Sequence, residues 1–112
     1  MYKIDDDGTF KIIRGDSAEF DIYLPILDEE GQIIDEYTLQ EGDVLLFTVK
    51  KNTKTKDIIM QKSGQHIEIV PSDTHGLSYG NYAYDVQLTY NNGFVDTVIP
   101  PTKFIVCEEV TF

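Results

Sequence analysis

A strict alternation of apolar and polar side chains runs from residue 82 to residue 90. The apolar positions are Tyr82, Tyr84, Val86, Leu88 and Tyr90. Polar or small side chains occupy the positions between them. A period of two is typical of a β-strand, whose successive side chains point to opposite faces of a sheet. The pattern therefore predicts a strand with one face against a core and the other face in water.

Three residues near the start of this strand form a Leu-x-x-Gly-x-Tyr pattern, namely Leu77, Gly80 and Tyr82. This is the spacing of a tyrosine corner, in which the phenol hydroxyl bonds to the backbone a few residues upstream. Tyrosine corners occur at the start of strand F in Greek-key sandwiches. The segment is therefore predicted to be strand F of an immunoglobulin-like sandwich, with these three residues forming its structural corner.

The rest of the chain consists of short apolar runs separated by turn signals, which is typical of an all-β domain. Further strands are expected at residues 10–14, 20–24, 44–50, 58–61, 66–70, 94–99 and 103–110. The predicted fold is an immunoglobulin-like Greek-key β-sandwich of about seven to nine antiparallel strands.

The turn signals complete this prediction. Asp28 to Gly31 is expected to turn the chain, after which Ile33 and Ile34 can resume strand pairing. Pro71 to Thr74 predicts at most one short helical turn. The Asn91-Asn92-Gly93 sequence indicates a type I′ hairpin.

The length of 112 residues predicts one domain over residues 9–112, preceded by an acidic tail over residues 1–8. The single Cys107 cannot form an internal disulfide. The N-terminus lacks the apolar run of a signal peptide, and no run of about 18 apolar residues could span a membrane. We therefore expect no membrane association and synthesis in a reducing cytoplasm.

The net charge of −11 is unevenly distributed. Residues 1–47 hold thirteen acids and three bases, whereas residues 48–63 hold five lysines and one acid. Binding to a nucleic-acid backbone needs clustered positive charge that displaces counterions. An acidic chain of this kind is therefore not expected to bind nucleic acid directly, and a solvated surface or a basic partner fits it better.

Motifs that would indicate chemistry are weak. His66 lies beside Glu68 and His75 beside Asp73, but their spacing matches no compact zinc site. Cys107 falls on a predicted strand rather than beside a histidine that could activate it. The sequence therefore predicts no enzyme, with no catalytic residue, cofactor or metal.

Most of residues 9–112 resembles the small immunoglobulin-like domains of tailed phages and prophages of Gram-positive bacteria, in particular the N-terminal domain of the phage baseplate upper protein. The resemblance is carried by residues 13–17, 20–22, 41–50, 67–71 and 79–86. It implies a structural or interaction module of the virion tail or baseplate, with no catalytic residues to transfer. Such a protein is made in the bacterial host cytoplasm and assembles, as an oligomer, with other virion proteins or with itself.

Two other functions remain open. A small acidic inhibitor could imitate nucleic acid and block a host defence nuclease, because Asp16, Glu19 and Asp21 lie close along one predicted strand. Glu19 and Asp21 share a face and lie roughly 7 Å apart, near the phosphate spacing along one DNA strand. A glycan-binding receptor-recognition module could instead use Tyr37 and Tyr79, since exposed tyrosines favour protein and glycan contacts. These five residues are the candidate interaction residues.

Overall fold

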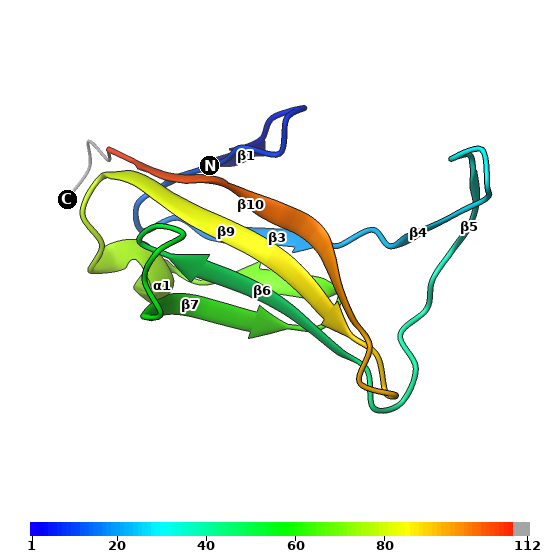
Figure 1. The fold of residues 1–112 in the computed structure, drawn as a ribbon. Coiled ribbons are helices and arrows are strands. Elements are labelled where there is room, and N and C mark those ends of the chain that lie inside the picture. The colour runs from blue at the N-terminus through cyan, green and yellow to red at the C-terminus, as the bar shows by residue number, and fades with distance from the viewer. Residues whose placement is uncertain (109–112) are drawn as a thin grey trace.

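The computed structural model describes residues 1–108, which form ten β-strands and one short α-helix (Figure 1). The elements in chain order are β1 (Tyr2–Ile4), β2 (Phe10–Ile13), β3 (Ala18–Asp21), β4 (Pro25–Leu27), β5 (Ile33–Glu36), β6 (Val44–Lys50), β7 (Ile58–Ser63), β8 (His66–Ile69), α1 (Pro71–His75), β9 (Gly80–Thr89) and β10 (Val95–Cys107). The one helix in this part of the chain is far too short to cross a membrane.

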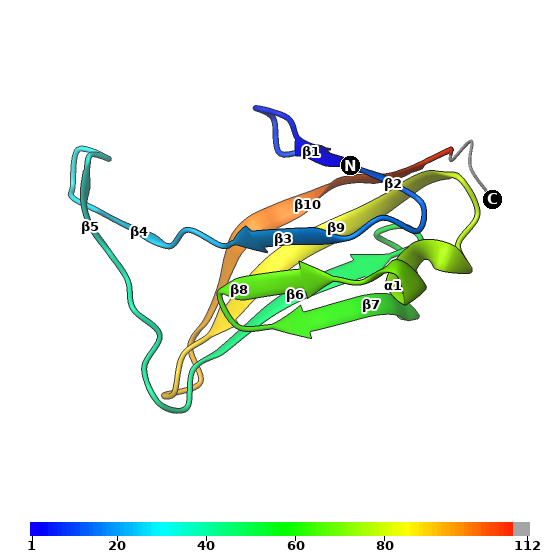
Figure 2. The ribbon, with the colours of Figure 1, turned by 180° about the vertical axis from the view of Figure 1, so that it is seen from behind.

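The strands form two facing layers, as Figures 1 and 2 show. The larger layer is a six-stranded sheet in the order β1-β2-β10-β9-β6-β7, and the smaller layer is the antiparallel pair β3-β8. The order β10-β9-β6-β7 corresponds to strands G, F, C and C′ of an immunoglobulin-like sandwich, with β3 and β8 in the places of B and E. The predicted all-β, sandwich-like fold is confirmed.

An aromatic cluster fills the space between the layers. The rings of Phe10 and Phe104 stack with centroids 4.9 Å apart, and those of Phe47 and Tyr84 lie 5.3 Å apart. All four side chains are at most 5% exposed. Ring pairs of this kind add stability beyond the area they bury, so this cluster joins β2, β6, β9 and β10 into one core.

The predicted alternation along β9 matches its burial. Tyr82, Tyr84, Val86 and Leu88 are all buried, and Tyr90 packs against the core from just beyond the strand end. The Tyr82 hydroxyl donates a 2.7 Å hydrogen bond to the Ser78 carbonyl, four residues upstream. This is the backbone bond that defines a tyrosine corner.

The first eight residues, which were expected to be an acidic tail, form a strand and a turn. β1 pairs antiparallel with β2, and the Tyr2 ring stacks on Phe10 at 5.7 Å. The Asp5 carboxylate lies 3.2 Å from the Lys11 ammonium and 3.4 Å from that of Lys3. These ion pairs hold the pKa of Asp5 below its usual value, and the apolar contact keeps the acidic segment on the sheet.

Two further details differ from the expectation. β2 runs parallel to β10, with Phe10 opposite Phe104, although all strands were expected to be antiparallel. The β9–β10 turn is not type I′, because a type I′ turn needs positive φ at both central residues and Gly93 alone has it here, at +89°. The Gly93 N–H bonds to the Tyr90 carbonyl, as in a type I turn followed by a glycine bulge.

The last predicted strand extended to residue 110. β10 covers Val95 to Cys107, with register shifts on both sides of Ile99, next to Pro100 and Pro101. Residues 109 and 110 lie outside the described part.

The predicted helical turn is present as α1, and it connects β8 to β9 across one end of the sandwich (Figure 2).

Candidate functional site

A two-stranded hairpin, formed by β4 and β5, projects from one end of the sandwich (Figure 1). We call residues 25–36 the arm. At its base the Tyr37 N–H donates a 2.8 Å bond to the Leu24 carbonyl. At its tip the Asp28 carboxylate accepts bonds from the backbone N–H groups of Glu30 and Gln32, at 3.0 and 2.8 Å. The arm is therefore an ordered hairpin.

The arm carries several large apolar side chains that remain exposed to solvent in the described chain. The exposed fractions are 37% for Ile26, 54% for Leu27, 60% for Ile33 and 64% for Ile34, and Tyr23 just before the arm is 51% exposed. Scattered exposed apolar residues are normal, but several gathered on one projecting element indicate a binding surface. The arm is therefore a candidate binding surface.

Asp43 anchors the segment that returns from the arm to the sandwich. Its carboxylate accepts a 2.5 Å bond from the Tyr37 hydroxyl and 2.8 Å bonds from the backbone N–H groups of Gln40 and Asn91. The bond to Tyr37 is the main cause of a lowered pKa at Asp43 and of a pKa of about 12 at Tyr37. Tyr37 also meets the Tyr90 ring edge-on at 5.5 Å, so it supports the arm.

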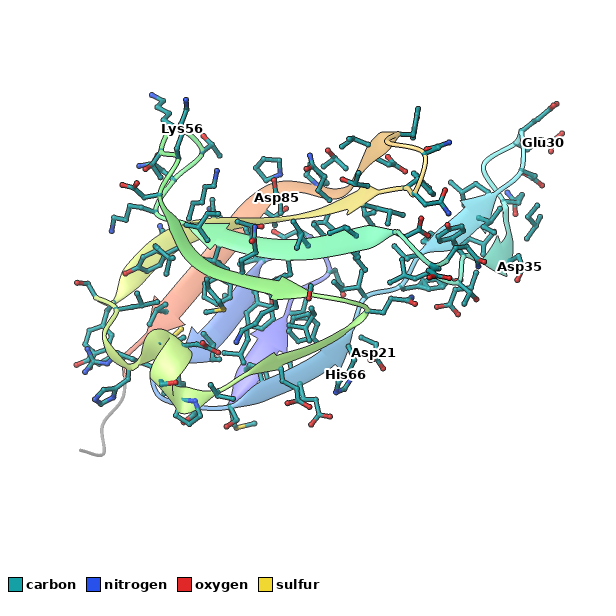
Figure 3. The ribbon with its side chains drawn as sticks, turned by 90° about the horizontal axis from the view of Figure 1, so that it is seen from below. Asp21, Glu30, Asp35, Lys56, His66 and Asp85 are labelled. Atoms are coloured by element: carbon teal, nitrogen blue, oxygen red, sulfur yellow. The ribbon has the colours of Figure 1, made fainter. Side chains whose placement is uncertain are left out.

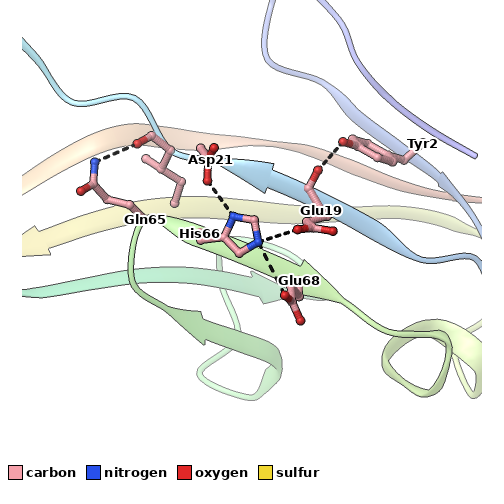
Figure 4. Close-up of polar contacts among 7 residues, drawn as sticks. Tyr2, Glu19, Asp21, Gln65, His66 and Glu68 are labelled. Carbon is pink, nitrogen blue, oxygen red and sulfur yellow. Dashed lines mark hydrogen bonds and ion pairs between the residues drawn. The ribbon is translucent and has the colours of Figure 1, made fainter.

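A second cluster surrounds His66 on the outer face of β3 and β8 (Figure 4). Strand pairing places Asp21 opposite His66 and Glu19 opposite Glu68. The His66 Nδ1 lies 2.7 Å from Asp21, and its Nε2 lies 2.8 Å from Glu19 and 3.5 Å from Glu68. The carboxylates, Asp21 foremost, raise the pKa of His66 above its usual value. An imidazolium ion compensates part of the charge of the three acids.

The same cluster offers the donor set of a metal site. One ligand atom each from Glu19, His66 and Glu68 lies within 4.8 Å of the others. Zinc accepts imidazole nitrogen and carboxylate oxygen, and Asp21 on Nδ1 would orient the ring. All these side chains are at least half exposed, so water and protons compete with an ion. An ion-pair cluster across the two strands accounts for the same geometry.

The remaining sequence-predicted residues lie apart from one another. Asp16 bonds to the N-terminal ammonium of Met1. Tyr79 is 41% exposed, and its ring lies 4.4 Å below the Arg14 guanidinium. Asp16, Glu19, Asp21, Tyr37 and Tyr79 are thus divided among four separate contacts, and they form no single surface.

A third feature is a shallow groove on the outer face of the larger sheet. It encloses about 330 Å³ between β6, β7, β9 and the loop that follows β6. Leu46, Ile58, Ala83 and Pro101 contribute its apolar lining, and its polar lining includes Lys50 and Asp85. The sequence indicated neither this groove nor the arm as an interaction site, although the apolar pair Ile33-Ile34 among acids was the available signal for the arm.

No protein-family model matches this chain, and comparisons with curated proteins and with solved structures gave no significant match. The candidate sites therefore stand on the geometry described above.

Proposed function

We propose that this protein is a non-enzymatic structural or interaction module that acts through protein contacts made by its arm. The exposed side chains of Ile26, Leu27, Ile33 and Ile34 carry the proposal. Burying apolar surface is the main favourable term in protein association. A hairpin held in shape at base and tip can bind without a large loss of conformational entropy, because its backbone is already ordered.

We place this module in the tail or baseplate of a phage particle, with synthesis in the bacterial cytoplasm. The support is the resemblance of its strand and turn sequences to small phage domains, together with the sandwich topology. Subunits of such assemblies need surfaces that meet several neighbours, and a projecting arm supplies one that reaches beyond the sandwich.

The nucleic-acid mimic has less support than the interaction module. A mimic needs unpaired carboxylates at regular spacing. Asp16 instead bonds to the N-terminus, and Glu19 and Asp21 share the His66 ring. Glycan binding has no better support, because Tyr37 and Tyr79 lie in separate contacts and Tyr37 is engaged with Asp43.

Removal of the arm tests the proposal. Leu24 and Tyr37 already share a backbone hydrogen bond, so Asn-Gly can replace residues 25–36 as a two-residue turn. We expect this variant to fold, as judged by near-ultraviolet circular dichroism. In a phage-producing culture, mass spectrometry should detect the tagged wild-type chain in purified particles and should not detect the variant.

Three results would contradict the proposal. The wild-type chain could be expressed but absent from particles, or the armless variant could be incorporated as well as the wild type. Alternatively, the chain could capture a host nuclease that is released as salt rises from about 50 mM to about 500 mM, which would favour the mimic.

A further inference from the structure

The two ends of the molecule carry opposite charge. The arm holds five acids and no base, namely Asp28, Glu29, Glu30, Asp35 and Glu36. The lysine-rich loop after β6 lies at the other end, and Figure 3 shows Lys56 there, far from Glu30 and Asp35. The described chain is 49 Å long in its longest dimension. The arm of one molecule therefore points away from its own lysine loop.

Three lysines in and beside this loop remain available to a partner. Lys51 lies over the Tyr82 ring at 4.8 Å, and Lys62 pairs with Asp73 at 2.8 Å. Lys50, Lys54 and Lys56 have no carboxylate within ion-pair distance among residues 1–108. Cations without a partner beside a groove that is lined in part by apolar side chains fit an acidic ligand with an apolar face.

The groove described above adds the apolar half of this match. Leu46, Ile58, Ala83 and Pro101 line it next to Lys50, and Ile58 is 51% exposed. The arm has the complementary components, since each of its two exposed aliphatic pairs, Ile26-Leu27 and Ile33-Ile34, is followed by carboxylates. Complementary charge sets the orientation of an association, and apolar burial supplies most of its free energy.

We propose that the partner of the arm is a second copy of this chain, whose groove receives the arm and whose lysines face the arm's acids. The proposal rests on the protein-contact function above. The contact is head-to-tail, because arm and groove are different surfaces, and repetition of such a contact generates rings or filaments. A single arm is small compared with the interface of a stable complex, which buries about 1,200 Å² or more. The association is therefore weak and depends on concentration.

Charge reversal in two variants tests this pairing. One variant carries Glu29→Lys and Glu30→Lys, and the other carries Lys54→Glu and Lys56→Glu. In sedimentation velocity experiments, the average mass of the wild-type protein should increase with its concentration. It should reach roughly twice the monomer mass or more near millimolar protein. Each variant alone should stay monomeric. An equimolar mixture should associate again, because the lysine arm of one variant faces the glutamate loop of the other.

A variant with Asp6→Lys and Glu108→Lys is the matched control, since both residues are exposed and lie outside arm and groove. It changes the net charge as the arm variant does and should associate like the wild type. A wild type that stays monomeric at all concentrations, or a mixture that does not associate, would overturn this inference. If the monomeric chain still enters phage particles through its arm, the proposed function stands and the self-association alone is rejected.

Discussion

Isoleucines in the sandwich and in the arm have opposite environments. Ile12, Ile67 and Ile69 are at most 1% exposed, whereas Ile33 and Ile34 are at least 60% exposed. All of them lie in paired β-strands, although the β4–β5 pair has a register shift between Ile26 and Leu27. The sandwich isoleucines face a second layer, and the arm is a single ribbon with no layer over it. Strand formation and core formation are thus separate properties in this chain, because the arm forms β-strands but no core.

The difference sets the stability that each region can have. A two-stranded hairpin is marginal in water unless another element covers it. Here the Asp28 turn and the Asp43 contacts hold the hairpin in place of a core. The arm is therefore expected to open more readily than the sandwich, and four experiments can break or sharpen this contrast.

The largest effect is expected from a matched pair of truncations, Ile67→Ala and Ile34→Ala. Ile67 is fully buried in β8, so its truncation should lower the free energy of unfolding by about 2–5 kcal/mol. Ile34 is 64% exposed, and its truncation should change stability by no more than about 0.5 kcal/mol. Urea unfolding of the isolated chain measures both. Similar losses at the two positions would mean that the arm is part of the core.

The buried tyrosine hydroxyls should give the next largest effect. Tyr82 donates to the Ser78 carbonyl at 2.7 Å, and Tyr84 donates to the Gly8 carbonyl at 2.5 Å. Tyr82→Phe and Tyr84→Phe each keep the ring and leave a carbonyl without its donor, so each should cost about 1–3 kcal/mol. Tyr23→Phe, at an exposed position beside the arm, is the control and should be neutral in the same denaturant melts. A neutral Tyr82→Phe would argue against the corner.

A local effect is expected at Asp43. In Asp43→Asn the amide nitrogen replaces one acceptor oxygen, so the bonds from Tyr37, Gln40 and Asn91 cannot all be kept. Hydrogen exchange should become faster at the arm and at the Gln40 and Asn91 amides, and stay unchanged in β9. Loss of the carboxylate should also lower the pKa of Tyr37 from about 12 toward 10, which absorbance titration can follow. Faster exchange throughout the sandwich would contradict a local anchor.

The smallest effect concerns pH. The pKa of His66 is raised in the folded protein. Protonation of His66 therefore stabilises the fold, and this contribution is fully present at pH values below the usual histidine pKa of 6.5. This contribution should be lost as the pH rises from 6.5 through the raised pKa of His66. His66→Gln should remove the corresponding fall in stability. The His66 carbon-bound proton signals in a magnetic resonance titration would report a pKa at or below 6.5 if the cluster were not formed.

The sequence predicted the elements whose signals are local. Alternation from Tyr82 to Leu88 identified β9 and its buried face, and Pro71 marked the start of α1. It did not predict the strand at Tyr2, because three aspartates follow it and the stabilising contact with Phe10 depends on tertiary packing.

The candidate sites were much harder to predict. The His66 cluster exists because β3 and β8 pair in one register, which brings together residues 45 positions apart. A strand pairing around Asp28 to Gly31 was predicted. The Ile33-Ile34 sequence alone does not show whether another layer covers these side chains. The proposed interaction residues were therefore chosen by type, and folding distributed them over separate contacts.

The parallel pairing of β2 with β10 has a mechanical consequence. Phe10 lies opposite Phe104 and Ile13 opposite Cys107, so the two outermost long segments of the chain run side by side in the same direction. A pulling force on the two ends would first peel β1 away from β2, one antiparallel pair at a time. The force would then act along the strand direction on the hydrogen bonds between β2 and β10. These bonds would share the force and break at the same time. A sandwich pulled by its two ends should therefore resist tension until these bonds break as a group.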